Sequence, residues 1–250
     1  QSHVMDVNPT TEFVLHLADN ALILGQRNAE WCGHGPVLEQ DIAISNISLD
    51  LIGQARSFYQ YATELQGNGA TEDSLAYLRN ERQFRNCLLV EQPKGDWATT
   101  TLRQFFFSTY QQLLFQQLLS YSDERIAAIA EKTLKEVNYH VRWSSEWVIR
   151  IGDGTAESHR RLEQAIQDLW LFTGELFTST HYEIESDVDV ALLRSNWEEK
   201  IRSNFEEASA EMPTNVFART GGKTGLHSEH LGFMLAELQY LQRSFPGCEW

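Results

Sequence analysis

The chain has 250 residues, of which 42% are hydrophobic and 22% charged, a composition typical of a globular protein with a substantial core. Lys and Arg number 20 against 35 Asp and Glu, and the resulting net charge of −15 argues against nucleic acid and anionic membranes as partners. Three cysteines without a Cys-x-x-Cys spacing, and no apolar run long enough to cross a bilayer, predict a cytoplasmic protein.

The first two predicted elements are long helices. Asn8 can cap the first, with Pro9 at its first helical position, and apolar residues follow at helical spacing over positions 13–24. The second helix carries an apolar stripe over positions 44–65, in which successive members are three or four residues apart. Gly67 is expected to end this helix, because glycine readily adopts the left-handed backbone found at helix ends.

Three more helices are expected in the middle of the chain. Thr71 can cap a short one that reaches about Phe84, and Asp96 can cap the next. A fifth helix is predicted to begin after a Ser122 cap, and its apolar stripe keeps helical spacing over positions 126–151. This stripe is the longest periodic signal in the sequence, and Gly152 is expected to end the helix.

The remaining sequence is also predicted to be helical. Thr155 can cap a sixth helix, and two more are expected over 190–208 and 226–245. No segment shows the strict alternation of a half-buried strand. Four of the expected helices exceed twenty residues, so the chain is predicted to be all-α, with its long helices packed as a bundle. We interpret residues 1–4 as a remnant of cloning ahead of Met5, and expect 5–250 to form a single domain.

Bundles of this size often hold a di-iron centre, and the sequence allows a direct test for one. A carboxylate-bridged di-iron site requires a Glu-x-x-His pair on each of two helices. Neither Glu nor Asp stands three residues before any of the histidines that could serve, which are His16, His34, His140, His159, His181, His227 and His230. We therefore predict that this chain has no functional site of this kind.

Six segments resemble the non-catalytic C-subunit of the bacterial phenylacetyl-coenzyme A epoxidases, and the resemblance extends over about residues 8–250. They read EWCGHGP (30–36), LDLIGQAR (49–56), NERQF (80–84), VEQP (90–93), KEVNYH (135–140) and TGGKTGLHSEHLG (220–232). The resemblance implies a ferritin-like bundle with additional C-terminal helices. It also implies a multicomponent monooxygenase, in which the di-iron centre and the coenzyme A thioester site belong to a related A-subunit, while the C-subunit is its non-catalytic companion.

The resemblance further implies how the cofactors are distributed. The reaction consumes oxygen and NADPH, and a separate reductase with a flavin and an iron–sulfur cluster supplies the electrons. This chain is expected to bind no cofactor and to contain no catalytic residue. Its positions that correspond to metal ligands of the catalytic relative are Glu30, Leu51, Gln54, Phe105, Val137 and His140. We expect Glu30, Gln54 and His140 to remain inside the bundle, hydrogen-bonded to one another or to water.

The residues leave room for other interpretations of function. Arg219 and Lys223, in the glycine-rich C-terminal segment, could contact an acidic surface of a partner, or could bind the phosphates of an acyl-coenzyme A. Alternatively, the chain could be an independently active oxidase with an unconventional metal site built from Glu30, Glu136 and His140. The hypothesis favoured by the resemblance is a metal-free structural subunit that associates with the di-iron subunit of the same epoxidase and supports its shape.

Overall fold

The computed structural model describes residues 8–214 and 216–248, and within these ranges every regular element is helical. The α-helices are α1 (Pro9–Ala29), α2 (Leu38–Gln66), α3 (Glu72–Tyr77), α4 (Leu88–Glu91), α5 (Trp97–Leu118), α6 (Glu124–Gly152), α7 (Ala156–Leu169), α8 (His181–Glu185), α9 (Arg194–Glu207), α10 (Glu229–Leu238) and α11 (Tyr240–Ser244). The interpretation of residues 1–4, and the start of the expected domain at Met5, lie outside the described residues.

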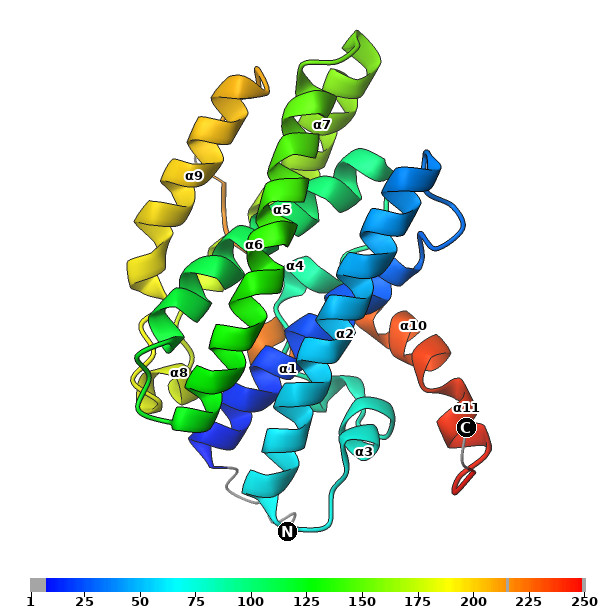
Figure 1. The fold of residues 1–250 in the computed structure, drawn as a ribbon, viewed down its shortest axis with the longest axis vertical. Helices are drawn as coiled ribbons and strands as arrows, with labels where there is room; N and C mark the ends of the chain where they lie inside the picture. Colours follow the sequence, from blue (N-terminus) through cyan, green and yellow to red (C-terminus); the bar gives the residue numbers. More distant parts are fainter. Residues whose placement is uncertain (1–7, 215, 249–250) are drawn as a thin grey trace.

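The architecture is that of a ferritin-like bundle with additional helices after it, as predicted. Its four longest helices, of 21, 29, 22 and 29 residues, form two pairs, α1 with α2 and α5 with α6. Figure 1 shows these two pairs side by side, with α7 and α9 at one end and α10 and α11 extending from the opposite side. Helices α2 and α6 contact each other across the bundle.

Most of the predicted helix ends are confirmed. The Asn8 side chain accepts a hydrogen bond at the start of α1, and Gly67 ends α2 with φ 60°. Asp96 and Thr155 cap α5 and α7 as expected. The prediction for α6 was wrong by one residue: the cap is Asp123 rather than Ser122, and the Asp123 carboxylate accepts backbone N–H groups of the first turn. A carboxylate suits this position because it also interacts favourably with the helix dipole.

Other helix lengths differ from those predicted. The third helix ends at Tyr77 instead of reaching Phe84, because Arg79 turns inward to an ion pair with the buried Asp19. The last predicted helix is divided at Gln239 into α10 and α11, and the Gln239 amide donates to the carbonyl oxygens of Ala76 and Arg79. In both places a tertiary contact of a polar side chain overrides the local helical pattern.

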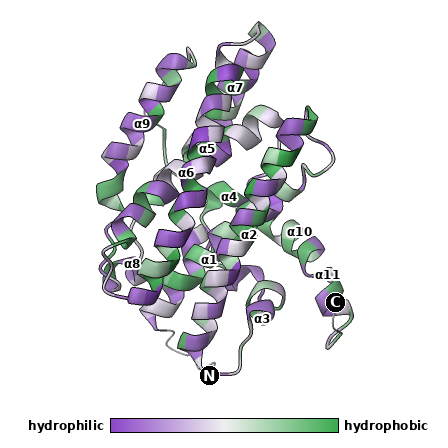
Figure 2. Cartoon of the chain, viewed as in Figure 1, coloured by the Kyte–Doolittle hydropathy of each residue, from purple (hydrophilic) through white to green (hydrophobic). Residues whose placement is uncertain are grey.

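Buried apolar side chains of the long helices form one hydrophobic core. The predicted stripe of α2 is buried from Ile44 to Ala62, with Leu65 half-buried at its end. In Figure 2 helices α2 and α6 alternate between hydrophilic and hydrophobic colour along their length, as expected when one face of each packs inward. Helices α1 and α5 are buried on almost every side. None of the helices in the described ranges is long and apolar enough to span a membrane.

Candidate functional site

Polar side chains from three helices meet where the resemblance places the former metal ligands. His140 of α6 is fully buried, and its Nε2 lies 2.9 Å from Oδ2 of Asp50 on α2. The Asp50 side chain is one-third exposed, so this pair joins the core to the surface. The other ring nitrogen of His140, Nδ1, is buried without a hydrogen-bond partner.

A second set of contacts lies one helical turn further along the same helices. Gln54 of α2 donates its amide to Glu136 of α6 at 2.9 Å, and Gln111 of α5 donates to Gln54 Oε1 at 3.0 Å. Gln54 and Gln111 are buried, whereas Glu136 is half-buried. These side chains, together with Asp50 and His140, form a polar layer across α2, α5 and α6, and we call them the polar layer below.

The other four predicted positions lie outside the polar layer. Leu51 and Val137 are fully buried, and Phe105 is almost so, which makes three of the six positions apolar core. Glu30 does not join the polar layer, contrary to the expectation. It lies at the C-terminal end of α1, where Arg27 of the same helix donates to its carboxylate at 2.7 Å. Its hydrogen-bonding partner is thus local, and Asp50 and Glu136 stand in its place beside His140 and Gln54.

The donor set of the polar layer does not fit a di-iron centre. Such a centre requires several carboxylates and two histidines converging on the bundle axis. Here His140 is the single imidazole of the layer, and Leu51, Phe105 and Val137 offer no donor atom. Within the described residues, no three His, Cys, Asp or Glu side chains lie close enough together to hold one metal ion. The contacts that the layer does make are hydrogen bonds that connect α2 with α5 and α6.

A larger buried polar cluster anchors the glycine-rich C-terminal segment. Glu175 accepts the backbone N–H groups of Leu88, Gly221 and Lys223, at 2.7, 2.9 and 3.1 Å. The Lys223 ammonium lies 2.7 Å from Glu183 and donates to the carbonyl oxygen of Thr178. Glu183 therefore neutralises the charge of Lys223 inside this chain, and Lys223 is only 2% exposed. The expectation that Lys223 contacts a partner or a phosphate was wrong, because its ammonium group is not accessible from outside.

Two glycines of this segment explain why it is rich in that residue. Gly225 has φ 88°, in the left-handed region, and a Cβ there would overlap the Arg82 carbonyl oxygen. A Cβ on Gly222 would lie 2.6 Å from the Asn86 carbonyl oxygen. The segment can therefore pack its backbone directly against residues 82–88 only where side chains are missing.

A third carboxylate, Glu91 of α4, holds the start of α10. It is fully buried and accepts from the Ser228 backbone, the Ser228 hydroxyl and Asn86. His227 lies with Nδ1 2.7 Å from Glu91 and Nε2 3.0 Å from the Phe84 carbonyl oxygen. Burial lowers the pKa of His227, but the hydrogen bond and charge of Glu91 outweigh burial and raise this pKa above its ordinary value.

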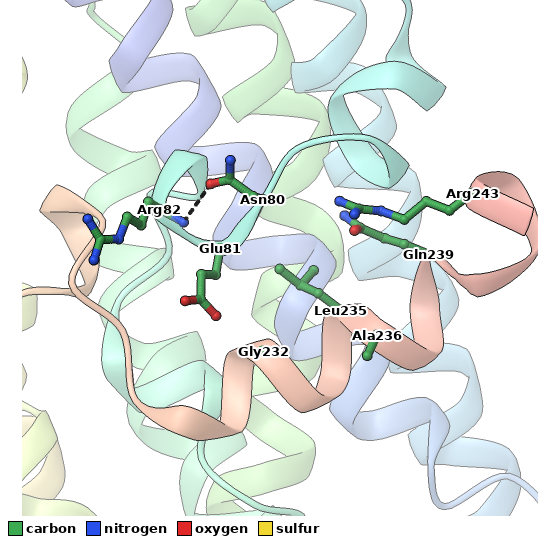
Figure 3. A pocket seen from close by; sticks show the side chains of 8 residues that line it. All are labelled: Asn80, Glu81, Arg82, Gly232, Leu235, Ala236, Gln239 and Arg243. Carbon is green, nitrogen blue, oxygen red and sulfur yellow. Dashed lines mark hydrogen bonds between the residues drawn. The ribbon is translucent and has the colours of Figure 1, made fainter.

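These contacts bring together three of the segments that carry the resemblance, 80–84, 90–93 and 220–232. Beside them an open pocket of about 420 Å³ lies between residues 80–82 and the helices α10 and α11. Figure 3 shows Glu81 pointing toward Gly232, with Gln239 and Arg243 closing the other end. Arg219, the other predicted partner contact, is exposed and lines a second pocket formed with Phe217 and Leu226.

The residues that sequence reasoning missed are mostly buried carboxylates. Asp19, Glu91, Glu175 and Glu183 were not singled out, yet all four are buried and hydrogen-bonded. Asp19, for example, stands in the run VLHLADNALIL, whose other residues are mostly apolar. An acidic residue at an apolar position is a usable signal, because a buried charge requires a partner.

Comparison with known proteins gives two findings. A family model described as phenylacetic acid catabolic protein matches residues 2–250 of the chain. The chain is also 49% identical over 249 residues to the C-subunit of the 1,2-phenylacetyl-CoA epoxidase of Escherichia coli strain K12, a match that covers 98% of this chain and 100% of that protein.

Proposed function

Because the chain belongs to the family of phenylacetic acid catabolic proteins, we propose that it is a metal-free structural subunit of a phenylacetyl-CoA epoxidase. In this role it associates with the di-iron catalytic subunit, whose shape it supports while the aromatic ring of phenylacetyl-coenzyme A is epoxidised. The di-iron centre then belongs to the partner, and the flavin and iron–sulfur cluster belong to the reductase component.

One observation carries the structural part of this proposal. The positions expected to hold metal ligands are filled by the buried apolar residues Leu51, Phe105 and Val137. Each contributes about 1.5 to 3 kcal/mol of hydrophobic stabilisation when fully buried, so the interior that would house a metal is instead part of the core. The polar layer beside them connects helices through hydrogen bonds, which favours a rigid body over a reaction centre.

Copurification with the candidate catalytic subunit tests partner and role together. We expect the two chains to elute as one complex, iron to follow the catalytic subunit, and product formation from phenylacetyl-coenzyme A to be lost when this chain is omitted. Omission removes no metal ligand, so the loss should accompany a less stable catalytic subunit. Full epoxidase activity without this chain would contradict the proposal.

The independent oxidase is the alternative of a different class, and it requires Glu30, Glu136 and His140 to share a metal ion. In the structure the carboxylate of Glu30 pairs with Arg27, Glu136 accepts from Gln54, and His140 faces Asp50. Metal analysis of the purified chain distinguishes the two functions. About one tightly bound iron per chain, lost in a His140→Ala variant, would favour the oxidase.

A further inference from the structure

Helix α2 is followed by an exposed turn that contains an Asn-Gly pair. Residues 67–71 connect α2 to the short helix α3, and Asn68 and Gly69 form a bend in this connection. In Figure 1 the connection lies at the lower end of the molecule, outside the packed helices. Asn68 is also the only asparagine in the sequence that a glycine follows. This neighbour matters because an asparagine amide can react with the backbone nitrogen of the next residue.

That reaction is an intramolecular acyl transfer, which proximity alone can drive. The backbone nitrogen loses its proton to a base in the solvent and attacks Cγ of the asparagine. A five-membered imide forms while the bond between Cγ and Nδ2 breaks, and ammonia leaves with a proton from water.

Water then opens the imide ring at one of two bonds. Cleavage between the nitrogen and Cγ gives aspartate, whereas cleavage between the nitrogen and the main-chain carbonyl carbon gives isoaspartate. The net change converts one amide and one water into one carboxylate and one ammonium ion. Nothing is oxidised or reduced, so no further reactant is required.

The turn leaves the attacking nitrogen free. Within the described residues, the backbone N–H of Gly69 donates no hydrogen bond. Asn68 and Gly69 are both exposed, so a base in the solvent can reach this N–H. Gly69 has no side chain to hinder the attack, and a Cβ placed there would meet no atom of the described chain within 4 Å. The fold therefore gives this nitrogen neither a hydrogen-bond acceptor nor a cover.

The Asn68 side chain is also held over the turn. The backbone N–H of Ala70 donates to Oδ1 of Asn68 at 3.1 Å. This hydrogen bond closes a ring of atoms that includes both Cγ of Asn68 and the nitrogen of Gly69, so it restricts the distance between them. During the attack negative charge develops on Oδ1, and a donor already directed at that oxygen stabilises the charge, as in an oxyanion hole.

Other exposed asparagines lack these conditions. Asn46 and Asn138 are exposed in the middle of α2 and α6. Each is followed by a bulky residue, Ile47 or Tyr139, whose backbone N–H belongs to the hydrogen-bond ladder of the helix. Exposure of the amide alone is thus not sufficient, and these two positions are internal references for Asn68.

We propose that Asn68 is a site of spontaneous deamidation in the folded protein, which converts it to a mixture of aspartate and isoaspartate. The isoaspartyl product belongs to the class of substrates that protein isoaspartyl methyltransferases modify. The proposal does not depend on the proposed function, because every reacting atom other than those of the solvent belongs to this chain.

The modification changes the end of α2 in charge and in geometry. The last turn of α2 contains Glu64 and no basic residue. A carboxylate at position 68 adds negative charge near the C-terminal end of this helix, where the helix dipole disfavours it. Isoaspartate also lengthens the backbone by one carbon atom, which disrupts the turn that the Ala70 N–H closes. Aged protein should therefore be more acidic and less stable than fresh protein.

Ageing of the purified full chain tests the proposal. After incubation at mildly alkaline pH, peptide mapping by mass spectrometry should show conversion of amide to carboxylate at Asn68, while Asn46 and Asn138 stay intact. Labelling by an isoaspartyl methyltransferase with S-adenosylmethionine should rise in parallel. An Asn68→Asp variant identifies the acidic form on ion exchange.

Two variants test the assignment of the reacting atoms. Gly69→Ala should slow the reaction at least tenfold, because its side chain hinders the attacking nitrogen. Since Gly69 has φ 79°, alanine strains the turn, and Asn68→Gln is the second variant because it leaves Gly69 in place. It should abolish isoaspartate formation at position 68. Circular dichroism should show that both variants stay folded.

A synthetic peptide of residues 64–72 separates the effect of the fold from that of the sequence. We expect Asn68 of the folded chain to react at a rate within tenfold of that in the peptide, or faster. A rate more than tenfold below that of the peptide would show that the fold protects Asn68, and would overturn the proposal. Equal rates in the wild type and Gly69→Ala would also contradict it, because the Gly69 nitrogen would then not be the nucleophile.

Discussion

His16 and His227 are both buried, and their surroundings move their pKa values in opposite directions. Burial lowers the pKa of His16 to about 4, against the raising effect of the Glu183 charge. Its Nδ1 lies 2.7 Å from the Arg85 carbonyl oxygen and its Nε2 faces the Asn20 amide, an arrangement that suits the neutral ring. His227 instead presents both ring nitrogens to acceptors, which suits the protonated ring. Stability should therefore fall at acid pH through His16 and at higher pH through His227.

The His16 part can be measured with a His16→Gln variant. Between pH 6.5 and about 4 the unfolded chain binds a proton at His16 that the folded chain does not, so the free energy of unfolding falls as the pH falls. The full effect is about 3 kcal/mol, at about 1.4 kcal/mol per pKa unit. Urea unfolding from pH 7 to 4 should show this loss in the wild type and not in the variant. His34→Gln, at an exposed histidine, is the control and should behave as the wild type.

Lys223 allows a second prediction at the level of a single residue. Lys223→Met removes the cation paired with the buried Glu183, and an unpaired buried carboxylate costs about 3 to 5 kcal/mol. Equilibrium urea unfolding should show a destabilisation of that size. The double variant Glu183→Gln with Lys223→Met should recover part of it, because the uncompensated charge is then gone. A single variant as stable as the wild type would contradict the assignment of Lys223 to the core.

At the level of elements, the sequence predicts a helix boundary well where the contacts that make the boundary are local. Asn8, Asp96 and Thr155 cap through contacts within a few residues, and such local chemistry is visible in a sequence. The end of α3 and the break at Gln239 depend instead on polar contacts between segments far apart along the chain. No local pattern contains that information.

The cap of α6 gives a prediction that separates the two neighbouring candidates. Asp123→Ala should cost about 1 to 2 kcal/mol of unfolding free energy, because the carboxylate caps the helix. Ser122→Ala should stay within about 0.5 kcal/mol of the wild type. Tyr61 also donates to Asp123, at 2.5 Å, so a Tyr61→Phe variant measures that share separately. A larger loss for Ser122→Ala would return the cap to the residue predicted from the sequence.

At the scale of the whole molecule, the bundle and its four long helices could be predicted because apolar periodicity repeats along each of them. The composition of the polar layer could be predicted only in part. Gln54 and His140 were placed correctly inside the bundle, but their partners Asp50, Gln111 and Glu136 depend on how α2, α5 and α6 are aligned. The same limit applies to Lys223, whose partner Glu183 stands forty residues earlier.

The anchoring of residues 221–228 by Glu91, Glu175 and Glu183 also bears on how the chain folds during its synthesis. The four long helices leave the ribosome well before this segment does, and their bundle can begin to assemble without it. The three carboxylates then lack the donors that the finished molecule gives them. Until residue 228 emerges, the nascent bundle therefore has acidic side chains that must remain hydrated, and its final packing is completed only after these donors arrive.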